Sequence, residues 1–269
     1  MPAVQLFATC LGDLLFAEAV ADTESMLREA GFDVVFPRGQ VCCGQPAFNS
    51  GHRAAARRVA RTFVSAFSRE LPIVTPSGSC AAMVARQLPA LVGCEPYEVW
   101  ELSVFLQAHD VEPPRCNEGR RVAYHDSCHM SRELGIVDAP RRLLERSGAS
   151  LVPLPRPDLC CGFGGTFLLR QPEIALAMAD DKLAGASGLD ALVTSDPGCL
   201  LNLGARAERA FSIWLMSLPT VNGSRFGLAQ SVRPSEYRKS RSPGSSRRLC
   251  PVNSAGVTNC SKICVVVPK

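Results

Sequence analysis

The sequence lacks the long apolar segment that a membrane-spanning helix requires, because no uninterrupted apolar run approaches about 18 residues. The first residues, Met1 to Val4, also lack the basic and apolar regions of a secretory signal peptide. From these two absences we expect a cytoplasmic protein without a transmembrane segment. Any association with a membrane would then be peripheral and would run through partner proteins.

An excess of positive charge is also missing from most of the chain. The 269 residues carry a net charge of +4, but residues 218–269 alone hold nine Lys and Arg against one acid, which is +8. Residues 1–217 therefore carry −4, and we expect no nucleic-acid partner. The composition of 218–269 predicts a basic, disordered tail, and we assign no metal site to its cysteines, Cys250, Cys260 and Cys264.

Cysteine, by contrast, is abundant, with 13 residues. In a reducing compartment this number indicates metal or redox chemistry rather than disulfides. The alternative is that several cysteines are plain buried thiols, which pack as small apolar side chains.

Eight cysteines form a pattern that occurs twice. The two sets of four are Cys10, Cys42, Cys43 and Cys80, and Cys128, Cys160, Cys161 and Cys199. The first three positions of the sets differ by 118 residues and the fourth by 119, and glycine follows each adjacent pair. A repeat of this length indicates a duplicated domain rather than a solenoid. We predict modules at 1–91 and 120–217, separated by a linker region at 92–119 with one helix around Val104.

Each half is expected to run strand–helix–strand–turn–helix–strand–turn. The predicted strands are 4–8, 33–37 and 72–75 in the first half, and 121–124, 150–154 and 191–194 in the second. We expect Asp13 to cap the first helix and Gly31 to end it. The predicted fold class is α/β, with two homologous modules related by a pseudo-twofold axis, each a small, mostly parallel sheet with flanking helices. Loops at the carboxyl ends of parallel strands converge, which would gather each set of four thiols.

Four converging thiolates suit a soft metal centre, either tetrahedral zinc or an iron–sulfur cluster. Zinc commonly uses two short Cys-x2–4-Cys hooks, and none occurs among the repeated positions. Adjacent cysteines fit a cluster with several iron corners better, and Gly44 and Gly162 permit the bent backbone that this requires. Structural zinc, a redox dithiol or plain packing remain alternatives.

The motifs Cys42-Cys43-Gly44 and Cys160-Cys161-Gly162-Phe163-Gly164-Gly165-Thr166 resemble the twin CCG modules of the heterodisulfide-reductase B-subunit superfamily. Residues 4–205 are similar to the lactate utilization protein A family in further stretches, including Pro76-Ser77-Gly78-Ser79-Cys80 and Tyr124-His125-Asp126-Ser127-Cys128. The resemblance implies an iron–sulfur electron-transfer component of a three-protein system that oxidises L-lactate to pyruvate. It implies one cluster per module, of the 4Fe-4S type, and partners among the other subunits of that system.

Two positions depart from the superfamily's fullest pattern, which ends in Cys-x-x-Cys. Met83 and Asn202 stand where the last cysteine would be, so we expect four ligands per half. A self-contained heterodisulfide-reductase-like or 2-hydroxy-acid oxidoreductase is the alternative function, and a structural zinc protein is a third. No flavin or nicotinamide motif is present.

Several polar residues beside the cysteines receive simpler interpretations. We interpret His125 and His129 as hydrogen-bonded turn residues, with tuning or ligation of a centre as the alternative. Asp126 and Asp196 are expected to be N-caps or turn formers, and Cys94 and Cys116 to be structural. The stretch 162–165 resembles a phosphate loop but lacks the dinucleotide spacing, so we assign its glycines to room around a cluster.

Overall fold

A computed structural model of the chain describes residues 1–207 and 212–215, the latter as backbone only. The predicted tail at 218–269, with Cys250, Cys260 and Cys264, lies outside the described residues. Within them no helix is long and apolar enough to cross a membrane.

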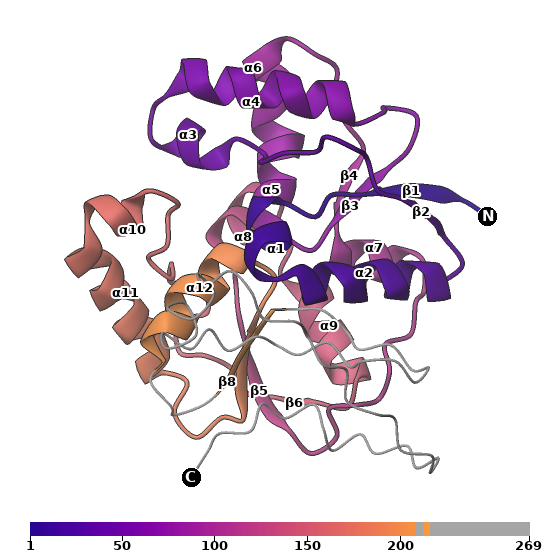
Figure 1. The fold of residues 1–269 in the computed structure, drawn as a ribbon. Helices are drawn as coiled ribbons and strands as arrows, with labels where there is room; N and C mark the ends of the chain where they lie inside the picture. The colour runs from indigo at the N-terminus through magenta and orange to yellow at the C-terminus, as the bar shows by residue number, and fades with distance from the viewer. Residues whose placement is uncertain (208–211, 216–269) are drawn as a thin grey trace, which may run out of the picture.

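The first half of the chain forms a parallel four-stranded sheet with the order β2-β1-β3-β4 (Figure 1). Its strands are β1 (Ala3–Leu6), β2 (Asp33–Val35), β3 (Ile73–Thr75) and β4 (Val99–Glu101). The helices are α1 (Cys10–Leu15), α2 (Ala17–Glu29), α3 (Gln45–Asn49), α4 (Arg53–Ala66), α5 (Gly78–Ala82), α6 (Leu88–Val92) and α7 (Leu102–Ala108), with a π-helical turn, Met83–Gln87, between α5 and α6.

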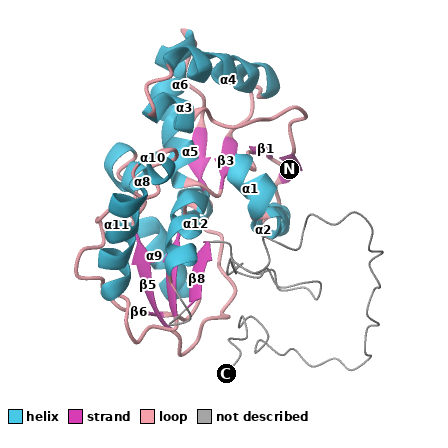
Figure 2. Ribbon diagram, turned by 60° about the vertical axis from the view of Figure 1, so that its left-hand side comes forward, coloured by secondary structure: helices cyan, strands magenta, loops and turns pink. Residues whose placement is uncertain are grey.

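The second half repeats this arrangement with the order β6-β5-β7-β8, again parallel (Figure 2). Its strands are β5 (Arg121–His125), β6 (Ser150–Leu151), β7 (Ala191–Thr194) and β8 (Ser212–Leu215). The helices are α8 (Cys128–Glu133), α9 (Asp138–Arg146), α10 (Phe167–Arg170), α11 (Pro172–Ala184) and α12 (Pro197–Arg206). The predicted α/β class with two homologous modules is therefore confirmed.

The elements form where the apolar pattern places them, and two differences have clear physical reasons. The first helix begins at Cys10, and its cap is Thr9, whose hydroxyl accepts from the amide of Gly12, so the assignment of Asp13 as cap was wrong. Each sheet also has a fourth strand, β4 or β8, where three per half were expected. Both are short edge strands that pair with a single neighbour, so their local pattern is weak.

The stretch 92–119, predicted as a linker region, contains α7 around Val104 as expected. It also contributes β4, whose residues pair with β3 in the first sheet. The division of the chain at 1–91, 92–119 and 120–217 stays a prediction, but the first sheet draws its last strand from the middle stretch.

The two halves meet through a shared core and through the helices at the carboxyl ends of the strands. One buried cluster includes Val4 and Leu6 of β1, Phe105 of α7, and Val122 and Tyr124 of β5. At the centre of Figure 1, α5 packs on α8 and α1 packs on α12. In the repeat α1 corresponds to α8 and α5 to α12, so these two contacts are related by the pseudo-twofold axis. This places both cysteine sets at the centre of the molecule.

Candidate metal centres

The first cysteine group consists of Cys10, Cys42, Cys43 and Cys80, and the structure brings all four thiols together. The sulfur of Cys10 lies 3.4 Å from that of Cys42, and the sulfur of Cys43 lies 3.4 Å from that of Cys80. A hydrogen bond between Cys42 and Cys43 links the two pairs. All four are free thiols, with Cys43 and Cys80 buried and Cys10 exposed.

The sequence folds this way because each cysteine follows the carboxyl end of a parallel strand, where loops converge. Cys10 is the first residue of α1 after β1, and Cys80 lies in α5 after β3. The amide of Cys80 donates to the hydroxyl of Ser77, the N-cap of α5, at 3.3 Å. Gly44 has a φ of +89° and its amide points to the sulfur of Cys42 at 3.4 Å. This left-handed turn turns the adjacent thiols toward one site.

The second cysteine group, Cys128, Cys160, Cys161 and Cys199, repeats the first. The sulfurs of Cys161 and Cys199 lie 3.2 Å apart, and Cys128 hydrogen-bonds Cys160. Gly162 has a φ of +86°, and its amide lies 3.4 Å from the sulfur of Cys160. All eight candidate ligands are thus gathered in two groups of four, as expected, and their role as ligands stays a prediction.

Each group contains one thiol that ionises easily. The pKa of Cys42 is lowered to about 3, chiefly by a hydrogen bond from Cys10, whose own pKa is raised by the same bond and by burial. The pKa of Cys160 is lowered to about 2, chiefly by a hydrogen bond from Cys128, and that of Cys128 is raised in turn. A metal centre would take up thiolates and release the remaining protons. Four sulfur donors with backbone amides aimed at them fit zinc or an iron–sulfur cluster.

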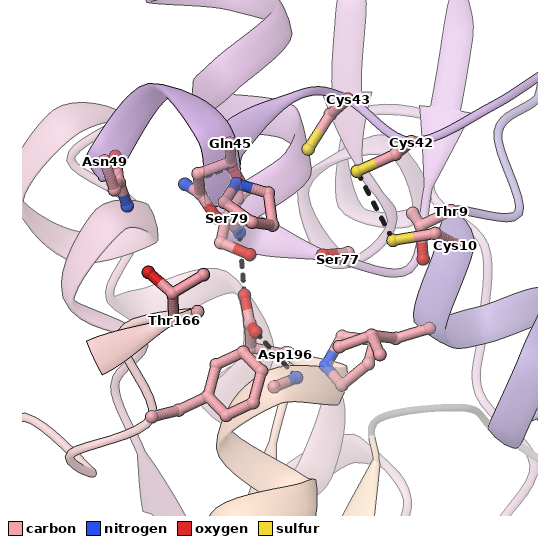
Figure 3. Close-up of a pocket in the computed structure, with 16 residues that line it drawn as sticks. Thr9, Cys10, Cys42, Cys43, Gln45, Asn49, Ser77, Ser79, Thr166 and Asp196 are labelled. Carbon is pink, nitrogen blue, oxygen red and sulfur yellow. Dashed lines mark hydrogen bonds between the residues drawn. The ribbon is translucent and has the colours of Figure 1, made fainter. Parts of the chain in front are cut away.

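A pocket of about 200 Å³ opens beside the first group, between the two halves (Figure 3). Cys10, Cys42 and Cys43 line one side of it, and Phe163 and Thr166 of the second half line another. This pocket and its polar lining residues were not predicted from the sequence; the residues are Gln45, Asn49, Ser79 and Thr166. Gln45 directly follows the first Cys-Cys-Gly turn and Asn49 ends the same short helix, α3, so their closeness to the turn is the signal that could have pointed to them.

Asp196 joins the loops of both halves. It is the N-cap of α12 and accepts from the amide of Gly198 at 3.1 Å, which confirms its expected role. Its other oxygen accepts from the amide of Ser79 at 2.8 Å and from the hydroxyl of Ser127 at 3.3 Å. Figure 3 shows the contact to Ser79 across the boundary between the halves.

Asp126 differs from its interpretation as a cap or turn former. Its two carboxylate oxygens accept from the guanidinium of Arg141 at 2.8 and 2.9 Å. The side chain is 5% exposed, so this is a shielded, bidentate ion pair that ties α9 to the end of β5.

His125 also differs from its interpretation as a hydrogen-bonded residue. It is 1% exposed, and neither ring nitrogen has a hydrogen-bond partner among the described residues. Burial, with a contribution from Lys182, lowers the pKa of His125 to about 3. One of its ring nitrogens and the sulfurs of Cys161 and Cys199 lie within 4.8 Å of one another, so the three residues could hold a metal ion.

His129 lies beside the second group in a more open position. Its Nδ1 is 3.6 Å from the sulfur of Cys128, and its Nε2 is 3.5 Å from the side-chain nitrogen of Asn49. Cys94 and Cys116 belong to neither group and are half-buried.

Comparison with known proteins identifies the repeat. The family model of the CCG cysteine-rich domain matches twice, at residues 4–85 and 122–204. Lactate utilization protein A of Geobacillus kaustophilus (strain HTA426) is 42% identical over 220 residues, covering 77% of this chain and 92% of that protein. The protein of the same name from Shouchella clausii (strain KSM-K16) is 39% identical over 219 residues, with the same coverage.

The chain also has a weak likeness to the solved structures of two glutamate racemases. The glutamate racemase of Francisella tularensis aligns over 80% of this chain and 76% of its own, at 12% identity and a TM-score of 0.32. Likeness at this level carries no argument about fold or function. The family is shown instead by the two matches of the family model and by the identity to the curated relatives. The chain belongs to the CCG cysteine-rich domain family, with lactate utilization protein A among its relatives.

Proposed function

We propose that this chain is an iron–sulfur electron-transfer component of an L-lactate oxidation system. Cys10, Cys42, Cys43 and Cys80 would hold one cluster, and Cys128, Cys160, Cys161 and Cys199 the other, each of the 4Fe-4S type. The observation that carries this proposal is the convergence of four thiols, twice, at matching positions of two parallel sheets. Its link to lactate comes from the names of the curated relatives.

When bound, such clusters supply one-electron transfer, and the chain's own residues set its conditions. The thiolates hold the iron, while the amides of Gly44, Gly162 and Phe163 lie 3.4 Å from cysteine sulfurs. Donors of this kind stabilise negative charge on sulfur and favour the reduced state. Cys43 and Cys161 are buried, which excludes water from one side of each group.

The partners would be other subunits of the same lactate-oxidising system in the cytoplasm, which would carry the hydride chemistry. Cys10, the exposed member of the first group, gives electrons a path between that group and the protein surface.

The pocket favours a second candidate, a self-contained oxidoreductase in which a substrate meets the first centre directly. Three cysteines of the first group line the pocket, so a small disulfide or hydroxy acid could reach them. Among the described residues, none that lines the pocket is a Lys or Arg that could pair with a substrate carboxylate, which favours a neutral disulfide over a hydroxy acid. Turnover of lactate or a disulfide by the purified chain with an artificial electron carrier, without partners, would establish this second function.

Anaerobic purification followed by analysis of iron, acid-labile sulfide and zinc tests the nature of the centres. We expect a coloured protein with iron and sulfide in equal amounts and with little zinc. Colourless protein with stoichiometric zinc and no sulfide would exclude the iron–sulfur proposal.

A further inference from the structure

His125 is a buried polar side chain whose two ring nitrogens have no partner among residues 1–207. Leaving a buried polar group unsatisfied costs about 1–3 kcal/mol, so a fold that retains one calls for an explanation. The ring lies at the end of β5, with one of its nitrogens within 4.8 Å of the sulfurs of Cys161 and Cys199. Once these thiols lose their protons, each sulfur becomes a stronger acceptor for the imidazole N–H.

The first half supplies the comparison. Subtracting the repeat length of 118 from His125 gives Phe7, which directly follows β1. Phe7 is fully buried in the same apolar cluster as Cys43 and Cys80, and its ring packs edge-on against Phe63. The position beside the buried thiol pair is therefore a phenyl ring in one half and an imidazole in the other.

Lys182 is a second polar residue of the second half that replaces an apolar residue of the first half. The repeat places it opposite Val64, a partly buried apolar residue. Lys182 is 3% exposed, and its ammonium donates to the carbonyls of Arg156 and Pro157 at 2.6 and 2.9 Å. Its charge interacts with the thiol groups of Cys161 and Cys199.

Asn202 is the third polar residue of the second half at a position that is apolar in the first half. It lies three residues after Cys199, where the first half has Met83 three residues after Cys80. Both are buried, but Asn202 donates to the carbonyl of Cys161 at 2.7 Å. At these three positions the second half therefore has an imidazole, an ammonium and an amide, where the first half has the apolar side chains of Phe7, Val64 and Met83.

We propose that His125 donates a hydrogen bond to the thiolate pair Cys161–Cys199 and thereby makes the second centre easier to reduce than the first. The inference rests on the proposed function, because it supposes a redox-active centre at each group. Hydrogen bonds to sulfur and nearby positive charge stabilise the more negative, reduced state and raise the reduction potential. The two centres of this pseudo-symmetric protein are then unequal, and the second one holds the electron.

The test compares His125→Phe with the parent in a Cys43→Ser background, so that only the second centre is titrated. A redox titration followed by visible absorption should show the potential falling by at least a tenfold change in the one-electron equilibrium, about 59 mV. Iron and sulfide should be unchanged. His125→Gln keeps an N–H donor and should retain most of the potential. His109→Phe, the same replacement beside Phe32 and Phe105, should change nothing.

Two results overturn the inference while the clusters themselves remain established. One is an unchanged potential in His125→Phe with full iron content. The other is loss of iron from a variant whose circular dichroism is unchanged, since this would make His125 a ligand rather than a hydrogen-bond donor. Failure of the proposed function looks different: the Cys43→Ser parent itself would contain no iron and no sulfide, and the inference would fall with it.

Discussion

Gly44 and Gly162 follow the two cysteine pairs and both adopt a left-handed backbone, yet their surroundings differ. A Cβ atom added at Gly44 would lie 3.5 Å from the carbonyl oxygen of Ala56, which is ordinary contact. A Cβ atom added at Gly162 would lie 2.4 Å from the carbonyl oxygen of Ala175. The second turn is therefore held against α11 by backbone contact, whereas the first has room.

This difference predicts unequal costs for the same replacement. Gly44→Ala should lower the free energy of unfolding by about 1–2 kcal/mol, the cost of a left-handed L-residue. Gly162→Ala adds a backbone clash and should cost more, roughly 3 kcal/mol. The melting temperatures of the two variants, measured at equal iron content, check the order, and equal losses would contradict it.

At the residue scale, the sequence was informative about the cysteines and much less so about their neighbours. The gathering of the eight thiols could be predicted, because the repeat is visible in the sequence and each cysteine follows a predicted strand. The role of His125 is different: its position beside Cys128 was visible, but only tertiary packing shows that its ring nitrogens lack partners. The same holds for Asp126, whose partner Arg141 is brought to it by the packing of α9.

Among the elements, α12 links the two halves through its N-terminus. Its cap, Asp196, accepts from Gly198 within α12, from Ser79 at the start of α5 and from Ser127 before α8. One carboxylate therefore positions the loops that carry Cys80, Cys128 and Cys199.

Asp196→Ala removes this link. It should lower the free energy of unfolding by about 2–4 kcal/mol, because a helix loses its cap and the amide of Ser79 loses its acceptor. Asp196→Asn keeps one acceptor oxygen and should cost less. We also expect Asp196→Ala to lose iron to a chelator faster than the wild-type protein does. Loss of iron at the wild-type rate would argue against the linking role.

Over the whole molecule, the contact between the halves includes a buried acid, Glu101. It ends β4 and accepts from the amide of Ser103 at 2.8 Å, and it also hydrogen-bonds Ser195 of the second half. Ser195 in turn accepts from the hydroxyl of Tyr124 at 2.8 Å. Burial raises the pKa of Glu101 to about 7, although the hydrogen bonds from Ser103 and Ser195 oppose the shift.

Because the folded pKa of Glu101 lies above its unfolded value of 4.5, the folded state binds the proton more tightly. Its contribution to stability is fully present below pH 4.5 and is lost as the pH rises to about 7. The loss amounts to about 3 kcal/mol. Glu101→Gln should remove this part of the pH dependence. The melting temperature of the variant, relative to that of wild type, should therefore rise between pH 5 and 7.5. Parallel profiles for the two proteins would refute this assignment.

The fold class, the two modules and the order of the repeated elements could be predicted because they follow from periodic patterns in each half. The fourth strands and the pocket could not, since they depend on how segments distant in sequence pack. The pocket in particular is formed by Cys42 and Gln45 of one half and Phe163 of the other. Local sequence patterns do not indicate such contacts between distant segments.

The claim that each half holds its own four-thiolate centre is tested most directly by measuring the iron content of four cysteine variants. Cys43→Ser and Cys161→Ser should each retain about half of the wild-type iron, and the double variant should retain almost none. Cys94→Ser, at a half-buried position outside both groups, is the matched control and should retain all of it. Wild-type iron content in both Cys43→Ser and Cys161→Ser would contradict the account.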